Sequence, residues 1–325
     1  MAEVTMNAAL NEALRRSLAE DECMLLFGED VGRLGGVFRV TDGLQQEFGE
    51  RRVFDTPLAE SAIAGVSVGL AIAGWRPVVE MQFDSFSYPA LNQVINHIAK
   101  YRSRTRGRLP MPIVVRMPYG GAVGAAENHS DSPEGYYAQT PGLKVVIPSS
   151  AVDAYALLRA SIADPDPVVF LEPKSRYWVK ETGDLGAPDA PPIGRARVVR
   201  DGTDCTVIAY GAMVARALAA ADRAAAQGTS VEVVDLRSLL PLDVETITAS
   251  VARTGRAVVV HEAPMTYGPG AEVSARIVEE CFDHLEAPVA RVAGHDIPYP
   301  PATIEQHHVP TNERILGAIA RTVGY

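Results

Sequence analysis

The sequence is poor in cysteine, and the few cysteines it has are widely separated. Three occur in 325 residues, Cys23, Cys205 and Cys281, an odd number without the spacing of metal ligands. They predict free thiols, as is typical of a reducing compartment. Runs of Lys and Arg are also missing, and the net charge is −10. This charge balance argues against a nucleic-acid-binding surface.

Long hydrophobic runs are missing as well. The stretch after Glu60, from Ser61 to Trp75, carries no charge, but it is too short and too rich in glycine to cross a bilayer. The N-terminal stretch MAEVTMNAALNEALRR has the pattern of an amphipathic helix with acidic residues, rather than that of a signal or transit peptide. We therefore expect a cytoplasmic protein without a membrane segment.

Three common catalytic motifs are absent. No GxGxxG opens a predicted helix, no Walker A loop occurs, and no GxSxG elbow is present. Gly35-Gly36 and Gly120-Gly121 are glycine pairs outside any phosphate-loop context. The usual nucleotide-binding and hydrolase functions therefore find no support.

What the sequence does contain is a regular alternation of apolar strands and helices. Segments such as CMLLFG, MPIVVRMP and PVVFLEP read as buried strands, and the pattern restarts with CTVIAYG, SVEVVDL and RAVVVHE. Continuous apolar strands between helices predict parallel sheets covered on both faces. The segment between the two series is rich in proline and glycine. We predict two doubly wound, mostly parallel α/β domains, residues 1–182 and 196–325, joined by a linker over 183–195.

One carboxylate, Glu60, stands at the start of the uncharged stretch. Thr56-Pro57 has the pattern of a helix start, with Thr as N-cap and Pro in the first turn, and predicts a buried helix that continues to Ala73. A glutamate in a first turn is commonly explained by the helix dipole. A carboxylate ahead of an apolar helix is also typical of a general acid or base with a raised pKa. The residues alone leave both interpretations open.

Two further stretches place polar side chains next to predicted strands. Residues 120–142 form a long glycine-rich loop in which His129 is a candidate proton donor. Asp131 could bind a metal ion with His129, but two ligands are too few for a site. FGEDVG places Glu29 and Asp30 directly after a strand, where α/β sheets gather ligands. A solvated histidine and two capping acids are the simpler interpretations.

Taken in order, these stretches resemble the β subunits of the thiamine-diphosphate-dependent 2-oxoacid dehydrogenases, the decarboxylating first components of multienzyme complexes. The similar segments are FGEDVG, DTPLAE, EMQFDSF, NHSDSPEGYY, TPGLKVVIPS, VVFLEPK, VVDLRSLLPLD and HEAP. They span essentially the whole chain, and the C-terminal part, from HEAPMT to HDIPYP, is most similar to the branched-chain members. The resemblance implies a transketolase-like pyrimidine-binding domain followed by a transketolase-like C-terminal domain.

The resemblance also implies roles for single residues. In the family, the glutamate at the position of Glu60 hydrogen-bonds the cofactor's aminopyrimidine and favours the imino tautomer, which takes a proton from the thiazolium carbon. Leu58 and Gln82 match residues that line the pyrimidine pocket, and Phe86 matches an aromatic residue that packs on it. Glu29 matches an acid on the path between the two cofactors of the assembled enzyme.

His129 matches the histidine that faces the substrate and assists transfer of the acyl group to lipoyl-lysine of the acyltransferase. A structural potassium ion is implied at four positions, Ile113, Ser161, Asp164 and Asp166, although asparagine is common where Asp166 stands. Gln139 replaces a second loop histidine that relatives often have.

Partners follow from the same resemblance. No GDG segment occurs in the chain, and in the family the α subunit supplies that segment and the Mg²⁺ it holds. This implies an α2β2 heterotetramer with β–β contacts through the C-terminal domain, and an isolated chain that is inactive. The resemblance also implies that Asp296 and Tyr325 fall in the region that docks the acyltransferase core in relatives.

Three alternatives to a branched-chain enzyme remain at this point. The first keeps the chemistry and changes the substrate to pyruvate or acetoin. The second is a non-catalytic scaffold or regulatory subunit, although both Glu60 and His129 are present. The third is a self-contained hydrolase that uses His129 and Asp131, for which no nucleophile motif exists.

Overall fold

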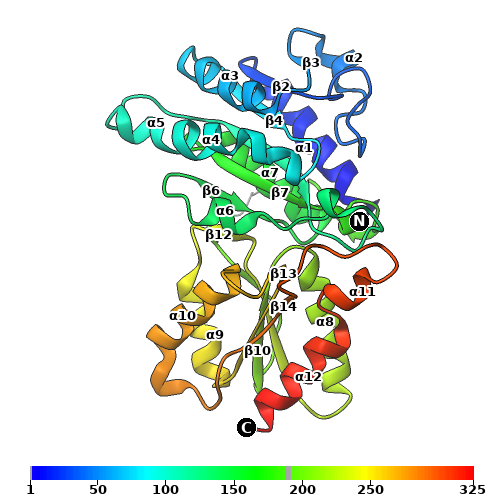
Figure 1. Ribbon diagram of the computed structural model, residues 1–325, viewed down its shortest axis with the longest axis vertical. Helices are drawn as coiled ribbons and strands as arrows, with labels where there is room; N and C mark the ends of the chain where they lie inside the picture. The colour runs from blue at the N-terminus through cyan, green and yellow to red at the C-terminus, as the bar shows by residue number, and fades with distance from the viewer. Residues whose placement is uncertain (1, 187–191) are drawn as a thin grey trace. The chain divides into compact units, whose positions relative to one another are not determined.

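The computed structural model describes residues 2–186 and 192–325, and the chain divides into two units (Figure 1). The N-terminal unit contains residues up to Tyr119 and from Tyr136 to Ile193, and the C-terminal unit contains Gly120–Gly135 and Gly194–Tyr325. The loop over 120–135, which the sequence places in the first predicted domain, therefore packs with the C-terminal unit. Much of the predicted linker, residues 187–191, lies outside the described residues.

A parallel sheet forms the centre of the N-terminal unit. Its strands lie in the order β6-β7-β5-β4-β2-β3. Their bounds are β2 Met24–Gly28, β3 Val53–Asp55, β4 Arg76–Glu80, β5 Val114–Tyr119, β6 Lys144–Val146 and β7 Val168–Pro173. Every residue of β2, β5 and β7 is buried, which explains why these strands are apolar runs without alternation.

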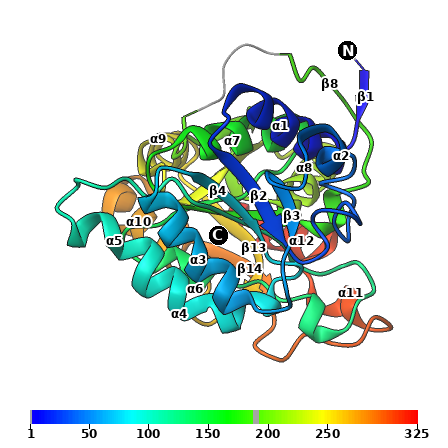
Figure 2. The ribbon, with the colours of Figure 1, turned by 90° about the horizontal axis from the view of Figure 1, so that it is seen from above.

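Helices cover both faces of this sheet (Figure 2). On one face α1 (Met6–Glu20) packs against α7 (Ala151–Ala163). On the other face lie α3 (Glu60–Ile72), α4 (Leu91–Gln93) and α5 (Ala99–Arg104). The predicted helix over ALNQVINHIAKYR is present, but a π-helical segment, Val94–Ile98, separates α4 from α5.

The start of α3 differs from the prediction. The helix begins at Glu60 with Ala59 at the N-cap, not at Thr56. The Thr56 amide instead donates a hydrogen bond of 3.0 Å to the carbonyl of Gly28, which extends the pairing of β3 with β2. Strand pairing therefore keeps Thr56 extended, and the helix starts four residues later. Its end is as expected, because Gly74 has a φ of +93°.

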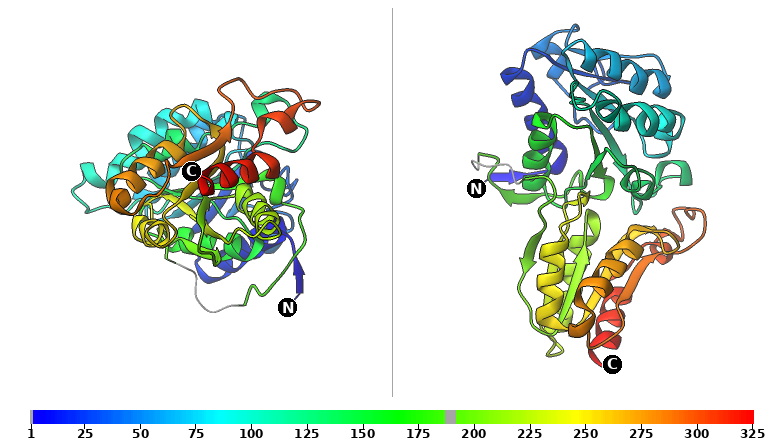
Figure 3. Two further views of the ribbon diagram at one scale, coloured as in Figure 1. Left: turned by 90° about the horizontal axis from the view of Figure 1, so that it is seen from below. Right: turned by 90° about the vertical axis from the view of Figure 1, so that its left-hand side faces the viewer.

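The C-terminal unit contains a second sheet, in the order β14-β13-β10-β11-β9. Its strands are β9 Arg197–Arg200, β10 Cys205–Ala209, β11 Val231–Asp235, β13 Ala257–Pro264 and β14 Ala290–Gly294. All pairs are parallel except β9 with β11. On one face α8 (Ala212–Ala225) packs against α12 (Asn312–Val323), as Figure 3 shows, and on the other α9 (Val244–Thr254) packs against α10 (Pro269–Cys281).

The remaining elements are short. They are β1 Ala2–Val4, α2 Leu44–Phe48, η1 Ser85–Ala90, η3 Glu127–His129, α6 Glu134–Ala138, η4 Lys174–Arg176, β8 Glu181–Gly183, β12 Ser238–Leu240, η5 Phe282–His284 and α11 Glu305–His308. β1 pairs with β8 in a two-stranded antiparallel sheet that the sequence did not predict. In the part of the chain that the structure describes, none of the helices combines the length and hydrophobicity needed to span a membrane.

Candidate active site

Predicted cofactor residues converge at one edge of the N-terminal sheet. Glu29 follows β2, and Gln82 follows the adjacent strand β4. Glu60 opens α3 after β3, the other neighbour of β2. Parallel strands end at the same edge of a sheet, so residues distant in sequence are brought together there. The fold thus places three of the predicted residues within one region.

Glu29 lies within electrostatic reach of Glu60. Glu29 is 9% exposed, and its Oε1 atom is buried without a hydrogen-bond partner within the described residues. Burial raises the pKa of the Glu29 carboxyl, and the negative charges of Glu60 and Asp30 raise it further. An orphaned carboxylate oxygen at a strand edge fits a ligand that brings a hydrogen-bond donor.

The segment with Gln82 and Phe86 is held in place by neighbouring side chains. Gln82 Nε2 donates a hydrogen bond of 2.8 Å to Asp30 Oδ2. Phe86 contacts Phe83 edge to face, with ring centroids 5.4 Å apart. Asp84, the N-cap of η1, forms a buried ion pair with Lys174. These contacts fix the strand-to-helix turn that carries both predicted pocket residues.

A buried charge network lies beneath this edge, and the sequence analysis did not find it. Arg116 on β5 donates to Glu80 on β4 at 2.8 Å and to Glu172 on β7 at 2.8 and 3.1 Å. The Tyr177 hydroxyl donates to Glu172 at 2.7 Å. Burial alone would lower the pKa of Arg116, but the carboxylates of Glu172 and Glu80 raise it, so the guanidinium stays charged. The available signal was a charged residue inside or at the end of three largely apolar strands: Glu80, Arg116 and Glu172.

The apolar helix after Glu60 is not fully buried, contrary to the prediction. One face packs inward through Ile63, Ala64, Ser67, Val68 and Ala71. Large apolar side chains on and beside the helix are exposed: Leu58 79%, Val66 56%, Ile72 43% and Trp75 39%. A sheet can cover only one side of a helix, so a helix that is apolar all round leaves the other side uncovered. Leu58 in particular is left largely uncovered by the residues that the structure describes.

His129 lies in the C-terminal unit, on the 3-10 turn η3. Its Nδ1 atom is 2.8 Å from the Asn128 side-chain oxygen. The Asp131 main-chain carbonyl accepts a hydrogen bond of 2.8 Å from the Gly120 amide. Among residues 2–186 and 192–325 no three His, Cys, Asp or Glu side chains are grouped as metal ligands would be. A metal site built on His129 and Asp131 therefore finds no third ligand there.

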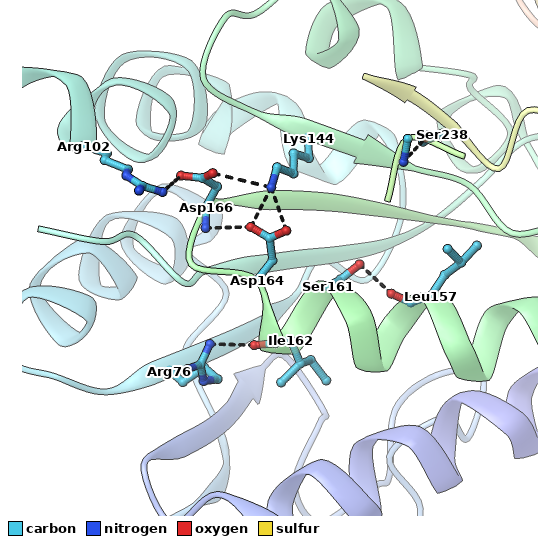
Figure 4. Close-up of polar contacts among 10 residues, drawn as sticks. Arg76, Arg102, Lys144, Leu157, Ser161, Ile162, Asp164, Asp166 and Ser238 are labelled. Carbon is cyan, nitrogen blue, oxygen red and sulfur yellow. Dashed lines mark hydrogen bonds and ion pairs between the residues drawn. The ribbon is translucent and has the colours of Figure 1, made fainter. Parts of the chain in front are cut away.

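Three of the predicted potassium residues, Ser161, Asp164 and Asp166, lie near the end of α7 (Figure 4). Lys144 Nζ is 2.6 Å from an Asp164 carboxylate oxygen and 3.4 Å from Asp166, and Arg102 also pairs with Asp166. The Ser161 hydroxyl donates to the Leu157 carbonyl at 2.7 Å. The carboxylates thus have cationic partners already, and these side chains do not fit a potassium site.

The main chain there is partly engaged as well. The Ile113 carbonyl accepts from the Val168 amide at 2.9 Å, and the Ile162 carbonyl accepts from Arg76 at 2.7 Å.

The predicted docking residues are both at the surface. Asp296 binds the amide and the hydroxyl of Thr266, at 2.9 and 2.7 Å, and these hydrogen bonds lower its pKa. Tyr325 is 83% exposed.

Comparisons with known proteins agree with this geometry. Residues 2–179 match the model of the transketolase pyrimidine-binding domain, and residues 194–315 match that of the transketolase C-terminal domain. The 3-methyl-2-oxobutanoate dehydrogenase subunit beta of Mycobacterium tuberculosis is 56% identical over 98% of this chain and 92% of its own length. The chain belongs to the β subunits of the thiamine-diphosphate-dependent 2-oxoacid dehydrogenases.

Other relatives fit the same family. The pyruvate dehydrogenase E1 component subunit beta of Leifsonia xyli is 50% identical over 98% of this β subunit and 95% of its own length. A solved structure described as a split gene transketolase, an inactive beta4 tetramer, superposes with a TM-score of 0.83 at 23% identity, covering 99% of this chain and 98% of the other. That structure supports the fold alone. The predicted α/β fold class and enzyme class are confirmed. The family depends on thiamine diphosphate and works with an α subunit.

Proposed function

We propose that this β subunit, together with an α subunit, decarboxylates branched-chain 2-oxo acids and passes the acyl group to lipoyl-lysine of an acyltransferase core. The observation that carries the proposal is the pair Glu29 and Glu60 at the carboxyl edge of the N-terminal sheet, with a buried carboxylate oxygen that lacks a partner there. The 56% identical relative, whose name specifies 3-methyl-2-oxobutanoate, supports the substrate class.

In this proposal the residues of the chain have two roles, proton transfer and binding of the pyrimidine. Thiamine diphosphate, when bound, would supply the nucleophilic carbon needed for decarboxylation of a 2-oxo acid and for transfer of its acyl group. Glu60 would hold and move a proton between its carboxylate and a ring nitrogen of the pyrimidine. Leu58, Gln82 and Phe86 would line the pyrimidine, and the contacts of Gln82 with Asp30 and of Phe86 with Phe83 support fixed positions for both side chains.

The partner contribution is part of the proposal. We infer that the α subunit supplies the diphosphate-binding segment and Mg²⁺, because no GDG occurs in the sequence and the described residues hold no acidic metal cluster. The exposed apolar face of α3 beside Glu60 supports coverage by the α subunit in an α2β2 assembly. Asp296 and Tyr325 are surface residues and remain proposed docking positions for the acyltransferase. For potassium, only main-chain carbonyls at the four predicted positions remain as proposed ligands.

The decisive experiment compares the co-expressed α and β subunits with the β chain alone. Decarboxylation is measured with thiamine diphosphate, Mg²⁺ and three substrates: 3-methyl-2-oxobutanoate, 4-methyl-2-oxopentanoate and pyruvate. Activity only in the co-expressed sample, highest with branched acids, is the expected result. A preference for pyruvate would instead make the chain the β subunit of a pyruvate dehydrogenase, an alternative that the 50% identical pyruvate dehydrogenase subunit favours. Equal inactivity of all samples would support a scaffold.

Two variants test the residue roles within the assembled enzyme. Glu60→Gln is expected to fold normally and abolish decarboxylation, because an amide cannot exchange a proton with the pyrimidine in the same way. Turnover near the wild-type rate would remove Glu60 from the mechanism. His129→Ala is expected to slow transfer to lipoyl groups more than decarboxylation, and an equal loss of both would contradict the proposed role of His129.

A further inference from the structure

The loop that carries His129 is held at its N-terminal end by three side chains of the C-terminal unit. The Gly121 amide donates to Glu262 at 3.0 Å, and the Ala122 amide donates to the Tyr299 hydroxyl at 2.8 Å. The Gly124 amide donates to Glu305 at 3.1 Å. Three amides within four residues thus bind acceptors from β13 and from the C-terminal part of the chain, around α11. We call Glu262, Tyr299 and Glu305 the loop clamp.

The clamp is internally connected. The Tyr299 hydroxyl donates to Glu305 at 2.9 Å while it accepts from Ala122, so a single oxygen links the loop to α11. Glu262 is 7% exposed, and Tyr299 is half-buried. Hydrogen bonds to charged and shielded acceptors are stronger than those exposed to water. The clamp can therefore restrain a glycine-rich loop that has little packing of its own.

The glycine pair at the start of the loop fits the clamp closely. A Cβ atom at Gly121 would lie 1.9 Å from the Tyr299 hydroxyl oxygen, so any side chain there would displace the Tyr299 ring. Gly120 has a φ of +81°, and a Cβ atom would meet Glu262 at 2.8 Å. The Gly120 amide also binds the Asp131 carbonyl at 2.8 Å, which closes the loop on both sides of His129. The role of Gly120-Gly121 is therefore to let the clamp side chains approach the loop main chain closely, and not to bind phosphate.

We propose that Tyr299, with Glu262 and Glu305, positions the loop of His129 for acyl transfer to lipoyl groups. The proposal rests on the proposed role of His129, but the clamp contacts stand without it. In this arrangement the C-terminal part of the chain governs the transfer half-reaction and not the decarboxylation at Glu60. Tyr299 is a positioning residue, since it acts through the loop main chain.

The test uses the assembled α/β enzyme with Tyr299→Phe, which removes the shared hydroxyl and keeps the ring. Tyr267→Phe is the matched control, because Tyr267 is 96% exposed. We expect amide hydrogen exchange over residues 121–124 to rise in Tyr299→Phe and lipoyl acylation to fall about tenfold, the scale of one lost hydrogen bond. Decarboxylation should stay within about twofold, since the variant leaves the Glu60 region intact. If amide hydrogen exchange over residues 121–124 is unchanged in Tyr299→Phe, the Tyr299 hydroxyl does not restrain the loop and the proposal is wrong.

Two further variants make the result decisive. Gly121→Ala approaches the same contact from the loop side and is expected to reproduce the transfer defect of Tyr299→Phe. His129→Ala separates the two proposals: if it loses transfer while Tyr299→Phe raises exchange without slowing transfer, the clamp does not position His129. If His129→Ala keeps full transfer, the proposed role of His129 fails first, and the positioning proposal fails with it.

Discussion

The guanidinium of Arg116 lies 2.8 Å from a carboxylate oxygen of Glu172, and both side chains are only 1% exposed. The same guanidinium reaches Glu80 at 2.8 Å, so one cation balances two carboxylates below the candidate site. The presence of such a network does not by itself show that it stabilises the fold, because transferring charged groups from water into the interior has a large free-energy cost. Removing one partner is nevertheless strongly destabilising, because the remaining charge stays buried without a counter-charge.

Arg116→Met is therefore expected to lower the free energy of unfolding by about 3–5 kcal/mol. Two carboxylates would lose their cation while staying buried. Urea unfolding of the β chain measures the change. Arg276→Met is the control, because Arg276 is 45% exposed and pairs with exposed Glu272 and Glu279, so its loss should stay within about 0.5 kcal/mol. Similar losses in the two variants would show that burial does not set the cost.

The pKa of Glu29 predicts an unusual pH dependence. Because the folded-state pKa is raised by burial and by Glu60, the folded chain binds its proton more tightly than the unfolded chain. This carboxyl therefore reduces stability as pH rises from the unfolded pKa through the folded one. Glu29→Gln should stabilise the β chain at pH 7.5 by about 1 kcal/mol, because the neutral amide does not carry the buried negative charge that burial and Glu60 disfavour. The advantage should disappear below about pH 4, where both forms are neutral.

Thermal melts from below pH 4 up to pH 8 provide the comparison for Glu29→Gln. Glu22→Gln is the matched control, since Glu22 is exposed and its variant should show no such dependence. A melting temperature of Glu29→Gln at or below the wild-type value at pH 7.5 would contradict the argument.

The exposed face of α3 predicts a variant that affects assembly without affecting folding. Val66→Lys places a charge at a side chain that is 56% exposed in the isolated chain, so unfolding of the β chain should change by about 0.5 kcal/mol or less. If the α subunit covers this face, a buried unpaired charge should prevent co-purification. Val278→Lys, at a 44% exposed site on α10, is the control. Normal α/β assembly of Val66→Lys would exclude α3 from the interface.

Lys144 provides a test of the potassium question. Lys144→Met removes the cation from Asp164 and Asp166 and should destabilise the β chain by about 1–3 kcal/mol in sodium buffer. If the two carboxylates then accept potassium, replacing Na⁺ by K⁺ should recover part of the lost melting temperature in the variant and not in the wild type. An equal melting temperature of the variant in sodium and potassium buffers would show that Asp164 and Asp166 do not bind potassium.

Much of the fold could be predicted from the sequence because the relevant signals are local. Apolar runs such as MLLFG and VVFLEP indicate strands buried on both faces. Helices that connect successive buried strands predict a parallel sheet. The ordered motifs also led to Glu29, Glu60 and Gln82, and the fold brings them to one edge. The start of α3 was predicted wrongly, because a continuing strand pair at Thr56 outweighed its capping propensity.

The sequence by itself determined the long buried strands, most of the helices between them, the family and the acids that follow β2 and β3. Only the tertiary structure decided that Arg116 pairs with Glu80 and Glu172, that Lys144 takes the carboxylates of Asp164 and Asp166, and that Tyr299 holds the loop of His129. The reason is physical. Periodicity and capping report on neighbours within a few residues, whereas a charge pair or a glycine's close contact depends on which distant segment the fold places opposite it.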